Sequence, residues 1–137
     1  MQLATRTGSV SKKALWTGRI LSGLPILFLL FDGVFKLVRP TPAAVVEAMN
    51  KLGYPPTLTV TIGLLLLVCV VVYIIPRTAV LGAILLTGYL GGAVATHTRV
   101  GDPLFSHVLF PVYMGLFVWG GLYFRDERLR ALIPLRG

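Results

Sequence analysis

The sequence predicts an all-α integral membrane protein, a four-helix bundle with a short amphipathic helix between the first two spans. Hydrophobic residues make up 55% of the 137 residues and charged residues only 13%. Together with a mean hydropathy of +0.82, this composition is typical of a chain whose solvent is lipid. Four apolar runs follow one another, each close to the ~20 residues that a helix needs to cross the hydrocarbon core.

The basic residues support the same fold class. The chain has 13 Lys and Arg residues against 5 Asp and Glu residues, and most of the basic residues lie at the edges of the apolar runs. Basic residues at these edges are typical of loops at a membrane surface. A nucleic-acid-binding protein would instead gather them on one face, so we expect no nucleic-acid partner.

The first apolar run, about residues 15–38, has no charged residue between Ile20 and Phe31. A secretory signal peptide is the competing interpretation, because basic residues precede the run. The apolar stretch is long for a signal peptide, and no small-residue cleavage site follows it directly. Asp32 and Lys36 also occupy its far end. We therefore expect a full membrane span.

A short helix is predicted between the first two spans. Thr41 and Pro42 are suited to the N-cap and first turn of a helix, and Gly53 with the prolines after it is suited to the end. Its apolar residues fall on one face, and Glu47 and Lys51 are spaced to pair on another. We expect this helix to lie along the membrane surface.

The other three runs, about residues 58–75, 78–98 and 107–124, contain no Asp, Glu, Lys or Arg. The connection between the second and third runs is so short that the two helices must form an antiparallel hairpin. Gly88 and Gly92 form a GxxxG pair in the third run, and Gly18 and Ser22 provide small residues in the first. Such residues favour close packing between membrane helices.

The predicted organisation is one transmembrane domain, residues 15–124, between basic segments at residues 1–14 and 125–137. Basic residues are retained on the cytoplasmic side of a membrane. The side that holds both termini has eight of the Lys and Arg residues in the loops and tails, and the other side has four. We therefore expect a multi-pass protein of the cell (inner) membrane with cytoplasmic N and C termini. The larger set is Arg6, Lys12, Lys13, Arg77, Arg125, Arg128, Arg130 and Arg136, and the smaller set is Lys36, Arg39, Lys51 and Arg99.

Polar side chains gather at the outer ends of the predicted spans. Ionisable groups in a membrane normally face protein or water and have a partner. Asp32 and Lys36 are spaced for a structural salt bridge, and the alternative is a pocket in which Asp32 and His97 exchange protons or hold a ligand. Two tyrosines either line a cavity below this cluster or pack within the bundle. The candidate pocket residues are Asp32, Lys36, Tyr89, Thr96, His97, Arg99, His107 and Tyr113.

Metal and catalytic motifs are weakly represented. His97 and His107 alone leave a metal or haem site short of ligands, so we predict no metal site. Cys69 is the single cysteine, which excludes an intramolecular disulfide or a CxxC redox pair. The sequence contains no nucleophile motif, phosphate loop or paired-carboxylate arrangement. We assign no catalytic residue and no cofactor, although a quinone is compatible with the polar cluster, and the sequence does not decide whether the protein is an enzyme.

The third and fourth runs contain a distinctive pattern. The strings GYLGGAVATH from Gly88, RVGDP from Arg99 and WGGLY from Trp119, with residues 125–134 after them, resemble the DoxX-like family of small four-helix bacterial membrane proteins. The resemblance extends from about Ile20 onward, and FDGVFK from Phe31 fits the family's first helix. It implies the four-helix fold and no particular activity, because some relatives are associated with membrane redox complexes and most have no assigned function.

These observations favour an accessory or small-ligand-binding membrane protein with a polar pocket near the outer face. Its expected partners are the lipid bilayer and either a small lipophilic ligand or a partner membrane subunit. The first alternative is a subunit of a quinone-linked oxidoreductase, in which Asp32, Lys36, His97 and Arg99 hold the quinone head group. The second alternative is a lipid isomerase-like enzyme that uses an acid and a base in the same pocket.

Overall fold

The computed structural model describes residues 11–132, which form helices and turns and contain no strand. Within this range, four helical segments are long and apolar enough to cross a membrane. The prediction of an all-α fold with four spans and a short helix after the first is therefore confirmed. The elements are α2 (Lys12–Leu37), α3 (Ala43–Leu52), η1 (Pro56–Leu58), α4 (Thr59–Ile74), η2 (Pro76–Thr78), α5 (Ala79–Arg99), the π-helical turn η3 (Leu104–Val108), α6 (Phe110–Arg125) and α7 (Glu127–Leu132).

Local sequence explains where several helices begin and end. Ser11 caps α2, because its Oγ accepts a hydrogen bond of 3.1 Å from the backbone N–H of Ala14. Gly53 ends α3 in the left-handed conformation, with φ +81°, which glycine adopts without steric cost. The third and fourth candidate spans, Pro76–Arg99 and Leu104–Arg125, begin with the short turns η2 and η3.

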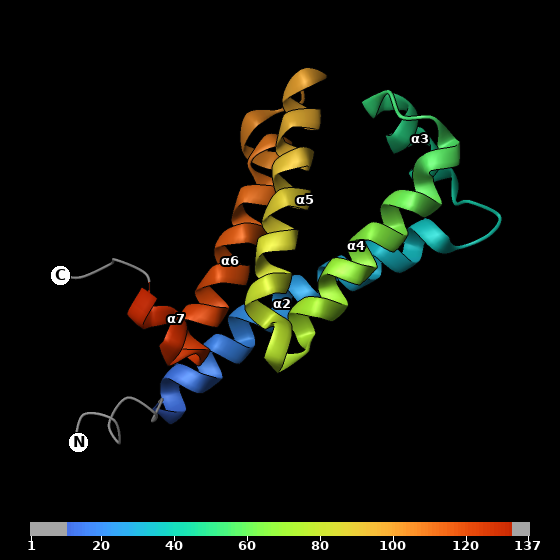
Figure 1. The fold of residues 1–137 in the computed structure, drawn as a ribbon. Helices are drawn as coiled ribbons and strands as arrows, with labels where there is room; N and C mark the ends of the chain where they lie inside the picture. The colour runs from blue at the N-terminus through green and yellow to red at the C-terminus, as the bar shows by residue number, and fades with distance from the viewer. Residues whose placement is uncertain (1–10, 133–137) are drawn as a thin grey trace, which may run out of the picture.

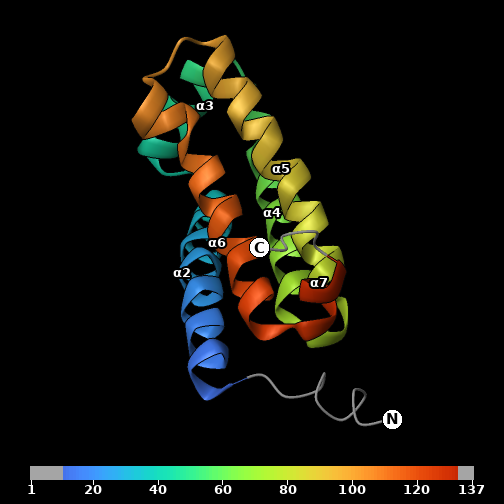
Figure 2. The same ribbon diagram turned by 90° about the vertical axis from the view of Figure 1, so that its left-hand side faces the viewer.

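The four long helices form a ring in which α2 packs against α4 and α6, and α5 packs against the same two helices. One end of the bundle, here called the α7 end, holds the start of α2, the turn η2 and α7 (Figures 1 and 2). The opposite end, here called the α3 end, holds α3 and η3. The helices α4 and α5 meet at η2 and separate towards the α3 end (Figure 1).

Two helix pairs approach closely where small residues face each other. A Cβ atom on Gly121 of α6 would lie 2.8 Å from the backbone N of Ser22 in α2 and 3.0 Å from the carbonyl O of Gly18. A Cβ atom on Gly63 of α4 would lie 3.0 Å from the carbonyl O of Gly33 in α2. The expectation that Gly18 and Ser22 support close packing is therefore confirmed.

Gly88 and Gly92 do not pack against another helix. A Cβ atom on either residue would have no neighbour within 4 Å. The interpretation of this GxxxG pair as a packing surface within the bundle is therefore wrong, because α5 has already separated from α4 at this level (Figure 1).

The core lies towards the α7 end, where all four helices meet. Its polar centre is Tyr73 of α4, which is 1% exposed. The Tyr73 hydroxyl donates a hydrogen bond of 2.7 Å to the carbonyl O of Val118 in α6 and accepts one of 2.7 Å from Oγ of Ser22 in α2. Three helices are thus joined by one satisfied network in an apolar surrounding. The apolar residues of this core include Leu29, Leu66, Val70, Ala83, Leu86, Val118 and Leu122.

Candidate functional site

Two hydrogen bonds fasten the end of α3 to the end of α5. Nη2 of Arg99 donates a hydrogen bond of 2.6 Å to the carbonyl O of Leu52, which is one of the carbonyls that a helix leaves unpaired at its C-terminus. The hydroxyls of Tyr54 and Thr96 lie 2.8 Å apart. Because the Thr96 hydroxyl donates its hydrogen to the carbonyl O of Gly92 at 2.8 Å, Tyr54 is the donor in this pair.

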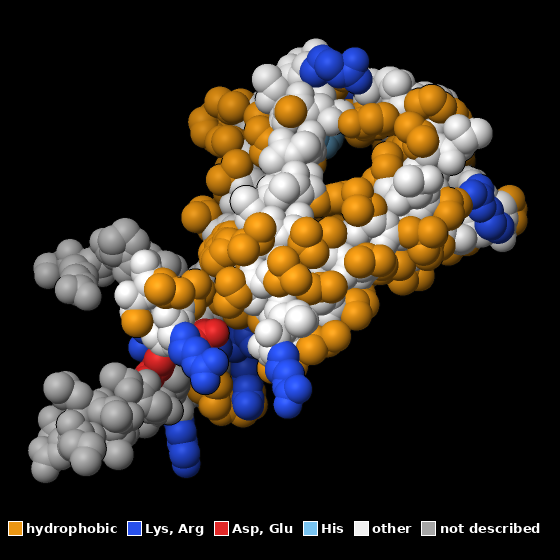
Figure 3. All heavy atoms as spheres, in the orientation of Figure 1, with side chains coloured by type: hydrophobic (Ala, Val, Ile, Leu, Met, Phe, Trp, Pro, Cys, Tyr) orange, Lys and Arg blue, Asp and Glu red, His pale blue; other side chains and the backbone are white. Residues whose placement is uncertain are grey.

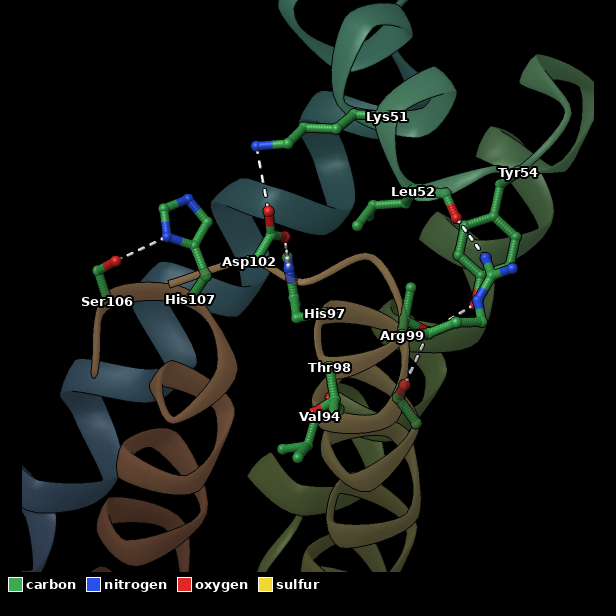
Figure 4. Close-up of polar contacts among 12 residues, drawn as sticks. Lys51, Leu52, Tyr54, Val94, His97, Thr98, Arg99, Asp102, Ser106 and His107 are labelled. Atoms are coloured by element: carbon green, nitrogen blue, oxygen red, sulfur yellow. Dashed lines mark hydrogen bonds and ion pairs between the residues drawn. The ribbon is translucent and has the colours of Figure 1, made fainter. Parts of the chain in front are cut away.

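A buried carboxylate in the loop after α5 makes the third connection. The Asp102 side chain is 3% exposed and lies 3.1 Å from Nζ of Lys51 and 2.6 Å from Nδ1 of His97. The hydrogen bond from His97, and next the one from Lys51, lower the pKa of Asp102 below its usual range, since both stabilise the ionised form. Figure 4 shows Asp102 between α3 and His97.

The two histidines lie side by side. The ring centroids of His97 and His107 are 5.9 Å apart, and Nδ1 of His107 lies 2.8 Å from Oγ of Ser106. An ionised Asp102 accepts the hydrogen bond from His97, so Nδ1 of His97 carries the hydrogen. In the part of the chain that the structure describes, no three His, Cys, Asp or Glu side chains come together as a metal site would need.

Asp32 and His97, which the alternative interpretation placed in one proton-exchanging or ligand-holding pocket, have separate partners. Asp32 forms an ion pair of 2.6 Å with Lys36 one turn later in α2, which is the geometry of the predicted structural salt bridge. Arg39 donates its hydrogen bond of 2.6 Å to Thr41. The partner of His97 is Asp102, in the loop that directly follows α5.

A cleft lies between α4 and α5 in the half of the bundle nearer to α3. Its volume is about 440 Å³. Figure 3 shows a hollow at this place, with hydrophobic side chains on its rim. We call it the α4–α5 cleft. Four hydroxyl-bearing residues line it, together with the two glycines that have no neighbour, Gly88 and Gly92. The complete lining is Tyr54, Leu58, Thr61, Ile62, Leu65, Gly88, Tyr89, Gly92, Ala93 and Thr96.

The cleft brings together only two of the predicted pocket residues, Tyr89 and Thr96. Arg99 lies beside it, through its contact with the segment that contains Tyr54 (Figure 4). The remaining candidates are elsewhere. Tyr113 donates a hydrogen bond of 3.2 Å to the carbonyl O of Phe105, and it lines a different hollow of about 310 Å³ beside α2.

A further groove of about 270 Å³ lies between α5 and α6. Its lining is apolar apart from Thr87 and Trp119. These two side chains satisfy each other, because Nε1 of Trp119 donates a hydrogen bond of 2.7 Å to Oγ1 of Thr87. Thr87 in turn donates to the carbonyl O of Ala83. The groove therefore offers no free polar group comparable to those of the α4–α5 cleft.

Three residues of the site were outside the predicted set. These are Lys51, Tyr54 and Asp102. The sequence predicts a pair of Lys51 with Glu47, and it singles out neither Tyr54 nor Asp102. A carboxylate five residues after His97, beyond the end of the same helix, is the one sequence signal that indicates the His97 pair. The contacts of Lys51 and Tyr54 depend on how α3 folds back, and no local pattern encodes that.

The fold and the cleft define a multi-pass α-helical membrane protein with a partly polar cleft near one end of its bundle. The sequence matches the model of the DoxX-like family over residues 20–121, a range that contains the cleft and most of all four spans. The chain belongs to the DoxX-like family, which confirms the resemblance. No curated protein and no solved structure is significantly similar to the chain.

Proposed function

We propose that the protein binds a small amphiphilic molecule in the α4–α5 cleft. The apolar part of the ligand lies along α4 and α5, and its polar part lies at Tyr54 and Thr96. The observation that carries the proposal is the cleft of about 440 Å³, a volume within the ordinary range of small-molecule sites.

The shape of the cleft supports an elongated ligand. Gly88 and Gly92 lie one turn apart on α5 and leave open space where side chains would otherwise project. Across the cleft, Leu58 and Leu65 are 39% and 56% exposed, so the apolar wall is accessible from outside the protein. In a bilayer, such a wall contacts acyl chains directly, and an amphiphile can enter from the side.

The polar groups of the cleft support a ligand with a hydrogen-bonding head. The Tyr54 hydroxyl uses its hydrogen on Thr96 and keeps its lone pairs as acceptors. Tyr89 lines the cleft, and its hydroxyl has no hydrogen-bond partner among residues 11–132. It is therefore a free donor inside an apolar wall, where an unmade hydrogen bond is costly.

The test is to purify the full chain in a mild non-ionic detergent and to identify retained small molecules by mass spectrometry. Gly92→Leu fills the cleft with a side chain, and we expect it to remove the retained amphiphile. Gly91→Leu is the matched control, because Gly91 also has open space around it but lines the groove between α5 and α6.

The outcomes separate the alternatives. An amphiphile retained by the wild-type protein and by Gly91→Leu, and lost from Gly92→Leu, supports the proposal. Gly88→Leu replaces Gly92→Leu if the latter does not fold. A ligand that both cleft-filling variants retain at the wild-type level, or no retained amphiphile at all, contradicts the proposal. A retained quinone favours the oxidoreductase subunit, and a retained neutral lipid favours a ligand-binding or isomerase-like protein.

A further inference from the structure

We infer that the amphiphile in the α4–α5 cleft carries a negatively charged head group, a carboxylate or a phosphate, which Arg99 binds. This inference rests on the proposed function and specifies the chemical class of the ligand. It depends on the position of the Arg99 guanidinium, on its remaining donors and on the acidic residues nearby.

Arg99 is held at the end of the cleft. Its Nη2 donates to the carbonyl O of Leu52, and a Cβ atom on Gly53 would lie 3.1 Å from the same Nη2. Figure 4 shows the guanidinium beside Tyr54, whose ring belongs to the cleft lining. The missing side chain at Gly53 therefore leaves room for the guanidinium at the polar end of the site.

The hydrogen-bonding capacity of Arg99 is only partly used. A guanidinium has five N–H donors, and the hydrogen bond to Leu52 occupies one of them. Arg99 is exposed. In the described part of the chain it forms no ion pair with a carboxylate. A planar group with several free donors favours an oxyanion, because carboxylates and phosphates accept two parallel hydrogen bonds from it.

The acidic residues of the α3 end do not neutralise Arg99. Asp32 pairs with Lys36, and Asp102 pairs with Lys51 and His97. Glu47 is exposed on α3 and forms no ion pair among residues 11–132. The positive charge of Arg99 is therefore available to a ligand, whereas the charge of Lys51 is already compensated by Asp102.

The cleft below Arg99 has the depth for an acyl or isoprenoid chain. Thr96 and Gly88 both line it and are about two turns apart on α5, or ~12 Å along the helix axis. A ligand with its anion at Arg99 places its first carbons between Thr96 and Tyr54, and the following carbons beside Gly92 and Gly88. A cation at one end and an apolar wall below it match a single-chain or two-chain anionic amphiphile.

The test compares three probes that share one chain: hexadecanoate, hexadecyl phosphate and hexadecan-1-ol. Binding to the full chain in a neutral maltoside detergent is measured by native mass spectrometry and by the shift in Tm. We expect at least one anion to bind about tenfold or more tightly than the alcohol, as a charge-assisted hydrogen-bonded pair allows. Preference for the carboxylate indicates a fatty acid, and preference for the phosphate indicates a phospholipid.

Two variants assign the preference to Arg99. Arg99→Gln should reduce anion affinity to that of the alcohol and leave alcohol affinity unchanged. Arg39→Gln is the matched control, because Arg39 is an exposed arginine of the same end whose hydrogen bond goes to Thr41. It should keep the wild-type preference, which excludes general attraction of anions to a basic surface.

The failures of the two proposals differ. Equal affinities of the wild-type protein for the anions and the alcohol, with all binding lost in Gly92→Leu, overturn the charge inference and support the proposed function. An unchanged preference in Arg99→Gln also overturns the inference. If that variant does not fold, the wild-type ratio of anion to alcohol affinity decides by itself. No binding of any probe to the wild-type protein overturns both proposals.

Discussion

Asp102 is the residue on which the α3 end depends most. Its carboxylate is nearly inaccessible, and it contacts both Lys51 of α3 and His97 of α5. A buried carboxylate is tolerable only when its lone pairs are used by such partners. The single side chain thereby holds the loop after α5 against α3 and fixes the orientation of the His97 ring.

The first prediction concerns the pH dependence of stability. The pKa of Asp102 is lower in the folded protein than the ordinary value of 3.8. A carboxyl group of this kind stabilises the fold above its ordinary pKa, and the stabilisation is lost as the pH falls through the folded value. We therefore expect a Tm in detergent that is steady from about pH 7 to 5 and falls below about pH 4.

Variants assign this fall to Asp102. Asp102→Asn should have a lower Tm at neutral pH and a weaker decline below pH 4, so its difference from the wild-type protein shrinks with acid. Asp32→Asn is the control, because it removes a carboxylate from the other lysine pair and leaves Asp102 intact. An identical acid decline in the wild-type protein and Asp102→Asn would show that other groups cause it.

At the residue scale, the sequence predicts where polar side chains lie along the bundle better than it predicts which of them are in contact. The polar cluster at one end of the bundle follows from where charged and imidazole side chains interrupt the apolar runs. The salt bridge of Asp32 with Lys36 follows from helical spacing. The partner of His97 does not, because Asp102 lies in a loop whose path is set by Gly101 at φ +74° and by α3 above it.

Single helices and the contacts between neighbouring helices form the next scale. The extents of the four spans can be predicted from the lengths of the apolar runs alone, since each span needs ~20 residues to cross the bilayer. The sequence does not predict which small residues face a neighbouring helix. Gly18 and Gly33 lie in close seams, whereas Gly88 and Gly92 border the cleft, although a GxxxG spacing in sequence favours packing. The difference arises from the divergence of α4 and α5, a tertiary property.

The second prediction compares two glycines in the interiors of long helices. A Cβ atom on Gly121 would lie 2.8 Å from the backbone N of Ser22, and one on Gly23 would have no neighbour within 4 Å. Gly121→Ala should therefore force α2 and α6 apart and cost about 1–3 kcal/mol of unfolding free energy. Gly23→Ala should stabilise the protein by about 0.5–1 kcal/mol through helix propensity.

Reversible unfolding in mixed micelles measures both free energies. The backbone of Ser22 belongs to the seam, so trimming a side chain cannot relieve the clash at Gly121. Equal effects of the two substitutions would mean that α2 and α6 do not touch at this seam, and the ring of four helices would need revision.

The whole molecule is a ring of helices that is closed at the α7 end and open at the α3 end. Core packing concentrates where Tyr73 joins α2 and α6 through Ser22 and Val118. The helices α4 and α5 separate towards the α3 end (Figure 1). There, polar contacts join Leu52 and Tyr54 to the end of α5. Such a cleft does not appear in a hydropathy profile, because every helix that borders it reads as an ordinary apolar span.

The third prediction concerns the orientation of the whole bundle. Among residues 11–132, the α7 end carries Arg19 and six members of the predicted larger set, and the α3 end carries the four members of the smaller set. Arg6 and Arg136 lie outside the described residues. Since basic residues are retained on the cytoplasmic side, the α7 end should face the cytoplasm and the cleft should open in the outer half of the bilayer.

Single-cysteine labelling measures this orientation, because Cys69 is the one cysteine of the chain and is buried in α4. In a Cys69→Ala background, Ser106→Cys marks the α3 end and Arg77→Cys marks the α7 end. A membrane-impermeant maleimide added to intact cells, or to spheroplasts where an outer membrane is present, should label position 106 at once. It should reach position 77 only after the cytoplasmic membrane is permeabilised. The reverse pattern would place the cleft and Arg99 on the cytoplasmic side, where a ligand would have to come from the inner leaflet.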